Sequence, residues 1–163
     1  MNYQTLCLLL SVLLLAGCKK NNSDDPQPTS DSLLKTWKVE SDVYAFGTKS
    51  LPFYNRTGDQ TKNLGDLSAI RYTFKADNTY VVVYNSNQES GTWVFQSNNL
   101  TLTESVSKTA DTYQVEKLDG STLILSQTTS ASALTTSDID FFKRLYNVDA
   151  SGGFKETATL SPN

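Results

Sequence analysis

The sequence contains no histidine, only two cysteines and no large excess of charge of either sign. Without histidine the chain cannot use a Ser-His-Asp or Cys-His mechanism, and it cannot bind a metal through imidazole. The net charge is −3, so no basic surplus favours binding to nucleic acid. Its 163 residues suffice for one domain. We therefore expect a protein without cofactor or metal that is not an enzyme.

Both cysteines belong to the N-terminal part of the chain: Cys7 lies within an apolar run and Cys18 follows it. Residues 6–16 are apolar except for Ser11. About eleven residues are too few to span a bilayer, which takes about 20, but they suit the core of a signal peptide. The run ends in Leu15-Ala16-Gly17-Cys18, followed by two lysines.

This ending resembles the lipobox of bacterial lipoproteins. The resemblance implies that residues 1–17 are a signal peptide and that Cys18 becomes the lipidated first residue of the mature chain. Cys7 would be removed, so no disulfide could form. Several acyl chains hold a protein firmly on a membrane. We expect an outer-membrane lipoprotein of the cell envelope, and a monomer. The alternative is an ordinary signal peptide in which Cys18 is incidental.

Residues 18–32 differ in composition from the rest of the chain. They contain no large apolar residue and hold two of the four prolines. Such a segment cannot bury enough surface to offset the entropy lost on ordering. It is expected to be a flexible linker that joins the anchor to a domain over residues 33–163.

From Leu33 onward, short runs rich in valine, tyrosine and threonine alternate with polar turn residues, which is typical of antiparallel strands. Asp119-Gly120 predicts a hairpin turn. The strands are consecutive and their connections are short, so neighbours are expected to pair. Closing the sheet would remove its exposed edges. The predicted fold is an all-β, antiparallel up-and-down barrel of about eight strands.

Two segments are less regular. Residues 45–66 are expected to form a long connection that folds back over the core. Residues 137–147 fit either a helix, which Ser137 could cap, or the strand that closes the barrel, and we favour the strand. Residues 148–160 would then be a further hairpin or an ordered tail, with a turn at Gly152-Gly153.

Three motifs carry a resemblance to a known family. They are Leu33 to Trp37, Tyr72 to Tyr80, and Gly91-Thr92-Trp93. Residues 33–128 resemble the lipocalin-like domains found in lipoproteins of the Bacteroidetes. The resemblance implies that Trp37 packs at the closed end of the barrel. It also implies that a late arginine stacks on this tryptophan. Arg144 is the candidate, with Lys143 second.

The aromatic residues of the strands are the candidates for lining the barrel. They either fill it or surround a small hydrophobic or amphipathic ligand. The alternative to ligand binding is a filled barrel that contacts another envelope protein or inhibits an enzyme. A buried carboxylate of raised pKa in a cleft would instead favour catalysis. Asp138 and Asp140 are expected to be solvated rather than paired for such chemistry. The candidate ligand-lining residues are Tyr72, Phe74, Tyr80, Tyr84, Trp93, Phe95 and Tyr113, joined by Phe53 and Tyr54.

Overall fold

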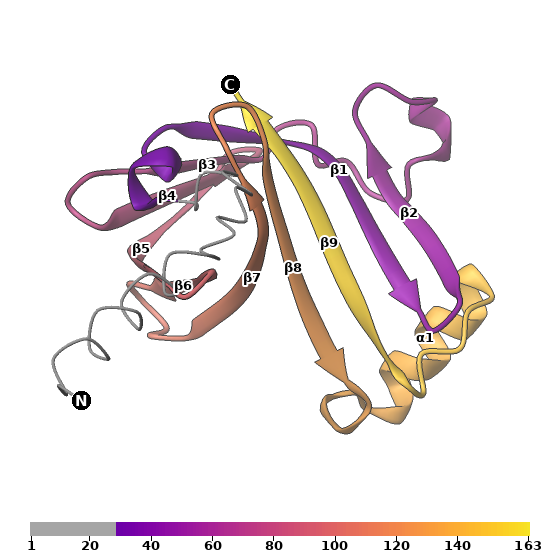
Figure 1. The fold of residues 1–163 in the computed structure, drawn as a ribbon. Helices are drawn as coiled ribbons and strands as arrows, with labels where there is room; N and C mark the ends of the chain where they lie inside the picture. The colour runs from indigo at the N-terminus through magenta and orange to yellow at the C-terminus, as the bar shows by residue number, and fades with distance from the viewer. Residues whose placement is uncertain (1–28) are drawn as a thin grey trace, which may run out of the picture.

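The computed structural model describes residues 29–163, so the predicted signal peptide, Cys18 and most of the linker lie outside the described residues. Nine strands form one antiparallel sheet, and eight of them close into a barrel (Figure 1). The predicted all-β barrel is confirmed. The strands are β1 (Thr36–Phe46), β2 (Lys49–Asn55), β3 (Arg71–Phe74), β4 (Thr79–Tyr84), β5 (Asn87–Gln96), β6 (Asn99–Glu104), β7 (Ala110–Leu118), β8 (Leu123–Ser130) and β9 (Gly153–Pro162). Short helices are η1 (Ser30–Leu33), η2 (Gln60–Lys62), η3 (Ala131–Ala133) and α1 (Thr136–Tyr146).

Strand β1 holds the barrel together because both of its edges are paired. One edge pairs with β9 from Trp37 to Ala45, and this pairing closes the barrel. The other edge is shared: Thr36–Lys38 pair with β3, and Ser41–Phe46 pair with β2. Strands β3 to β8 each pair with the next strand in sequence. Strand β2 is therefore an extra strand beside the barrel.

The expectation of a long connection over residues 45–66 is wrong in its first half, which contains β2. Gly47 adopts φ +57°, which permits the tight turn between β1 and β2. Pro52 lies in β2 where the register with β1 shifts, between Asp42 and Val43. An edge strand with a bulge is a position that tolerates proline. Pro52 and the glycines on either side of β2, Gly47 and Gly58, are typical of a loop, which is why the sequence predicted one here.

The preference for a strand at 137–147 is also wrong, because this segment is helix α1. Thr135, rather than Ser137, is the N-cap, and it forms a capping box with Asp138. Asn147 ends the helix in the left-handed conformation, at φ 53°. The closing strand is β9, which starts at Gly153. The helix lies at the far end of β1, β2 and β9, where it covers a second apolar cluster built on Phe46 (Figure 1).

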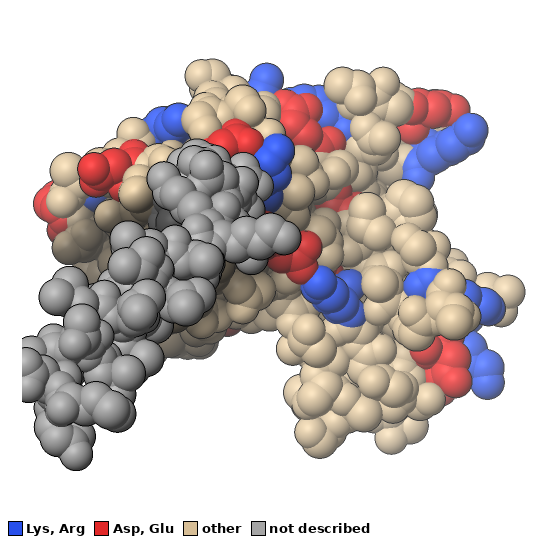
Figure 2. Space-filling model, viewed as in Figure 1, with Lys and Arg blue, Asp and Glu red and all other residues tan. Residues whose placement is uncertain are grey.

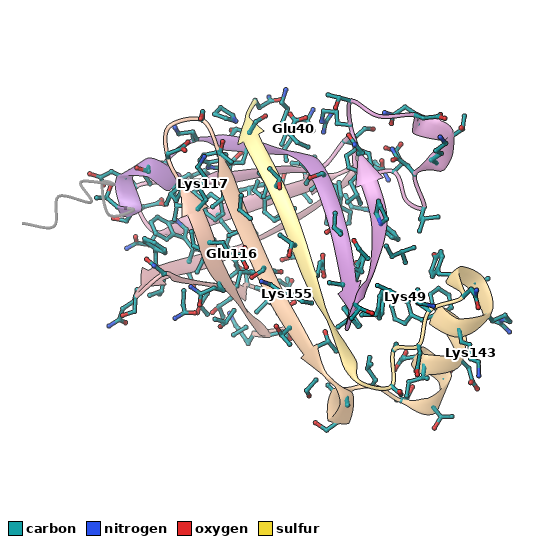
Figure 3. All side chains as sticks on the ribbon, turned by 45° about the vertical axis from the view of Figure 1, so that its right-hand side comes forward. Glu40, Lys49, Glu116, Lys117, Lys143 and Lys155 are labelled. Carbon is teal, nitrogen blue, oxygen red and sulfur yellow. The ribbon has the colours of Figure 1, made fainter. Side chains whose placement is uncertain are left out.

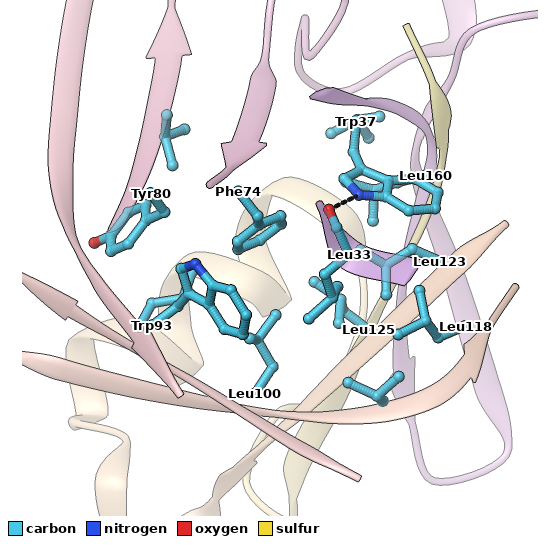
Figure 4. Packing of buried hydrophobic residues seen from close by; sticks show 14 of the residues in the cluster. Leu33, Trp37, Phe74, Tyr80, Trp93, Leu100, Leu118, Leu123, Leu125 and Leu160 are labelled. Atoms are coloured by element: carbon cyan, nitrogen blue, oxygen red, sulfur yellow. Dashed lines mark hydrogen bonds between the residues drawn. The ribbon is translucent and has the colours of Figure 1, made fainter. Parts of the chain in front are cut away.

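The closed end of the barrel is packed around Trp37, which is completely buried (Figure 4). Its indole Nε1 donates a hydrogen bond to the carbonyl oxygen of Leu33, at 3.0 Å. Leu33 belongs to η1, so this short helix fills the end of the barrel. It begins at Ser30, inside the segment expected to be linker. Around it pack Leu118, Leu123 and Leu160, and further along the barrel Phe74, Trp93 and Leu100.

The cation over Trp37 is Lys35, not the predicted Arg144. Lys35 Nζ lies 5.2 Å from the ring centroid of Trp37 and also donates to the carbonyl oxygen of Gly120, at 3.1 Å. Arg144 is exposed on α1, at the opposite end of β1 from Trp37 (Figure 1). The stacking prediction is wrong because Arg144 lies on helix α1, away from the end of the barrel where Trp37 is packed.

Charged side chains of both signs are interspersed on the outer face, and Figure 2 shows no large patch of one sign. Glu116 pairs with Lys155, and Glu40 pairs with Lys38 and Arg56. Within residues 29–163, no helix is both long enough and apolar enough to cross a membrane.

Candidate ligand-binding cavity

A cavity of about 60 Å³ lies inside the barrel, against β3, β7, β8 and β9. Side chains alternate between the two faces of a strand, and directly paired residues share a face. The pairs Leu123–Leu160, Leu125–Ala158 and Gln127–Glu156 therefore put one side chain after another into the interior. The lining residues are Tyr72, Tyr113, Leu125, Gln127, Glu156, Ala158 and Leu160.

The cavity is small for a lipophilic ligand. A water molecule needs roughly 10–15 Å³ measured in this way, whereas a dry cavity of about 150 Å³ accommodates benzene. The cavity therefore has room for a few waters or for one end of a small molecule. The rest of the barrel is filled by side chains.

Two of the seven candidate ligand-lining residues, Tyr72 and Tyr113, line this cavity. Phe74 and Trp93 are buried in the packed core, where their rings meet edge to face at 6.0 Å. Tyr80 is buried too, and its hydroxyl donates to Glu89, at 2.8 Å. These three residues fill the barrel.

The remaining candidates lie away from the cavity. Phe95 packs partly buried against the core, and Tyr84 is exposed near the turn that follows β4. Of the two further aromatics, Tyr54 is buried and Phe53 packs against the core, yet neither lines the cavity. Inward-facing aromatic residues thus mostly form the core.

The sequence analysis missed the polar residues of the interior, which are Asp42, Gln127 and Glu156. Glu156, Ala158 and Leu160 alternate, so assigning a strand to residues 153–162 would have placed Glu156 on the inner face. The inward orientation of Asp42 could not be predicted from strand alternation alone. Glu40 is an extra residue where the pairing of β1 with β9 shifts. This bulge changes the phase of the alternation, so Asp42 rather than Ser41 faces inward.

Asp42 is only 3% exposed, and its Oδ1 has no hydrogen-bond partner in the part of the chain that the structure describes. It lies directly opposite Ala158, a residue of the cavity wall, on one side and opposite Tyr54 on the other. The buried hydroxyl of Tyr54 also lacks a partner. A buried polar group without a partner costs about 1–3 kcal/mol. Both atoms belong to residues paired across β1 and β2, and residues 29–163 leave both polar groups unsatisfied.

The two interior carboxyl groups have pKa values above the usual range. Burial, followed by the charge of Glu156, raises the pKa of Asp42 to about 7, although the backbone N–H of Val43 partly opposes this rise. Burial alone raises the pKa of Glu156. Burial and then the charges of Glu156 and Asp42 raise the pKa of Tyr72 to about 12. The interior is thus acidic. No lysine or arginine of residues 29–163 lies close enough to alter the pKa of Asp42, Glu156 or Tyr72.

These residues do not form an evident metal site. Across the part of the chain that the structure describes, no three side chains of histidine, cysteine, aspartate or glutamate come together to hold a metal ion. The cavity combines aromatic walls, an apolar base and carboxylate and amide oxygens. Such a surface suits an amphipathic molecule better than a bare ion.

Three solved structures are similar to this chain. A lipocalin-like protein from Bacteroides uniformis has 11% identity and a TM-score of 0.46, with 81% of this chain and 99% of that chain covered. An uncharacterized protein from Bacteroides eggerthii has 11% identity and a TM-score of 0.46, over 80% and 99% of the two chains. A DUF4847 family protein from Bacteroides vulgatus has 16% identity and a TM-score of 0.42, over 77% and 92%.

No curated protein matches the sequence. The model of one family does, under the description "Lipocalin-like domain", and the match extends over residues 33–125. It includes Trp37, strands β1 to β7 and the first residues of β8. More than half of the chain is therefore matched, and this chain belongs to the lipocalin-like domain family.

Proposed function

We propose that this protein is a lipoprotein of the cell envelope, anchored through Cys18 in the outer membrane, whose barrel binds a small amphipathic ligand. The observation that carries the binding role is the cavity inside the barrel, with its mixed lining of aromatic, aliphatic and polar side chains. The anchor rests on the sequence Leu15-Ala16-Gly17-Cys18.

The lining favours an amphipathic ligand over a purely apolar one. Leu125, Ala158 and Leu160 offer apolar surface, while Gln127 and Glu156 offer hydrogen-bonding groups. A hydrocarbon alone would remove water from Glu156 without giving it a partner, at a cost of several kcal/mol. A ligand with a polar end in the cavity and an apolar part against the leucines and tyrosines would satisfy both kinds of surface.

Mass spectrometry tests both parts of the proposal. The full chain is purified in detergent from the membranes of its own cells and measured under native and denaturing conditions. We expect a native mass above that of the polypeptide, because a small molecule is retained. We expect a denatured mass that equals residues 18–163 plus acyl chains. A native mass without a bound molecule would contradict ligand binding, and a denatured mass without acyl chains would contradict the anchor.

A matched pair of variants tests whether a retained molecule occupies the cavity. Ala158→Leu adds bulk to the cavity wall, opposite Asp42 and Leu125. Thr157→Leu introduces a leucine at the next position, on the outer face of the same strand. We expect the first variant to lose the bound molecule and the second to keep it. Equal retention in both would place the molecule elsewhere.

The alternative role is a filled barrel that binds another envelope protein. Most of the interior is packed, which is the observation in its favour. It predicts a native mass free of small molecules, together with a retained partner chain.

Catalysis is the third possibility, because Asp42 and Glu156 are interior carboxyl groups of raised pKa. We propose binding rather than catalysis, since the cavity is small and its lining contains no serine, cysteine or lysine. Chemical conversion of the retained molecule during incubation would contradict this choice.

A further inference from the structure

We propose that the ligand carries a cationic amine, and that Asp42 and Glu156 hold its ammonium group inside the barrel. This inference rests on the proposed binding function and names the chemical class of the ligand. Both carboxyl groups come from neighbouring strands: Asp42 from β1 and Glu156 from β9. Their places on the inner face follow from the register, in which Asp42 pairs with Ala158, two residues after Glu156.

The unsatisfied oxygen of Asp42 is the first observation for a donor-rich ligand. The residue is only 3% exposed, and Oδ1 accepts no hydrogen bond from residues 29–163. A carboxylate oxygen can only accept hydrogen bonds, and an ammonium group offers three donors. Tyr54, which pairs with Asp42 across β1 and β2, has a buried hydroxyl that also lacks a partner within residues 29–163 and is able to accept a hydrogen bond.

The barrel separates its charges by face, which is the second observation. On β9, Lys155 pairs with Glu116 on the outer face (Figure 3). The next residue, Glu156, lies on the opposite face of the strand and lines the cavity. Glu40 also keeps its partners Lys38 and Arg56 on the outer side. The inner carboxylates receive no such cation from residues 29–163. A cationic ligand would supply the counter-charge that the two carboxylates need when ionised.

The walls of the cavity suit an organic cation. The rings of Tyr72 and Tyr113 line it, and the faces of such rings attract cations by about 0.5–2 kcal/mol. Leu125 and Leu160 give the short hydrocarbon part of an amine an apolar surface. A metal ion would gain nothing from the leucines. A carboxylic acid ligand would be repelled by Asp42 and Glu156.

Three small probes of equal length separate these cases. Butylamine, 1-butanol and butanoic acid are titrated at pH 8 into the detergent-solubilised full chain, and binding is followed by NMR chemical shifts. We expect butylamine to bind at least tenfold more tightly than butanol. We expect butanoic acid to bind more weakly than butanol.

Isosteric variants identify the groups responsible. Glu156→Gln and Asp42→Asn should each weaken butylamine binding at least fivefold and leave butanol binding unchanged. Glu116→Gln removes a carboxylate from the outer face and should change neither affinity, so it controls for the overall charge. Equal losses in Glu116→Gln and Glu156→Gln would overturn the assignment to the interior.

The remaining outcomes separate the inference from the function on which it rests. Equal affinity for butylamine and butanol would overturn the cationic ligand and leave ligand binding standing. Tight binding of Ca²⁺ in competition with butylamine would also overturn it, in favour of a metal ion. Failure of all three probes, while a molecule co-purifies with the chain, would overturn the amine alone. Failure of all probes together with a ligand-free native mass would overturn both proposals.

Discussion

The substitution Asp42→Asn removes a carboxyl group that the barrel keeps away from water. In the folded protein the pKa of this group is raised to about 7, first by burial and then by the charge of Glu156, against an ordinary value of 3.8. The unfolded chain therefore releases this proton at a lower pH than the folded protein does. Stability from this group is fully present below pH 3.8 and is lost as the pH rises to 7.

The size of the effect follows from the same two values. Between pH 5 and pH 7 the unfolded chain has lost the proton and the folded protein has kept it. Each pH unit in this window then lowers the free energy of unfolding by about 1.4 kcal/mol. Above pH 7 both states are ionised and the loss stops. From pH 5 to pH 8, Asp42 alone should lower the stability by about 3 kcal/mol.

We expect the wild-type protein to lose more stability over this range than Asp42→Asn does. Urea unfolding at pH 5, 6, 7 and 8, followed by the fluorescence of the buried Trp37 and Trp93, measures the difference in slope. Glu156 titrates in both proteins, and because its charge acts on Asp42 the difference in slope contains this coupling as well as the titration of Asp42 itself. The exposed Asp140 provides a control, since Asp140→Asn should keep the wild-type slope. Parallel stability profiles for wild type and Asp42→Asn would refute the reasoning.

Other predictions concern packing, capping and stacking. Gly91→Ala should destabilise the barrel by about 1–3 kcal/mol in urea unfolding, because a Cβ there would clash with the carbonyl oxygen of Thr103; unchanged stability would contradict the close strand contact. Thr135→Ala should lower stability by about 1 kcal/mol and speed amide exchange in α1, because the capping box is lost. Lys35→Met should cost about 0.5–1 kcal/mol through the lost cation–π contact, and Arg144→Met should cost nothing measurable in the same unfolding assay; the reverse order would restore the original stacking prediction.

The strands and turns of the barrel could be predicted because local sequence determines them. Asn78 and Asn98 adopt positive φ angles in the turns that the sequence predicted, and asparagine tolerates that conformation. Asp119 accepts hydrogen bonds from the backbone N–H groups of Ser121 and Thr122, so its turn is longer than the two-residue hairpin expected. Alternation and turn residues are local properties, and they sufficed for the fold class.

The interior polar site could not be predicted, because it depends on how distant strands align. The bulge at Glu40 turns Asp42 inward, and nothing in the neighbouring sequence indicates that bulge. Tyr72 lines the cavity while Phe74, on the same face of the same strand, fills the core. The two residues differ in role because they lie at different distances from η1, the short helix that fills the closed end of the barrel. The position of a side chain along the barrel axis can be assigned only when the register between the strands is known.

The pairing of β1 with β9 has a consequence for how the chain becomes a folded protein. Trp37 pairs with Pro162, so the contacts that close the barrel join segments separated by most of the described chain. Closing so long a loop is slow compared with forming hairpins between consecutive strands. The hairpins from β3 to β8 can form as the chain emerges during synthesis. Until β9 has paired with β1 and β8, the edges of these two strands stay unpaired and the acidic interior stays in contact with water.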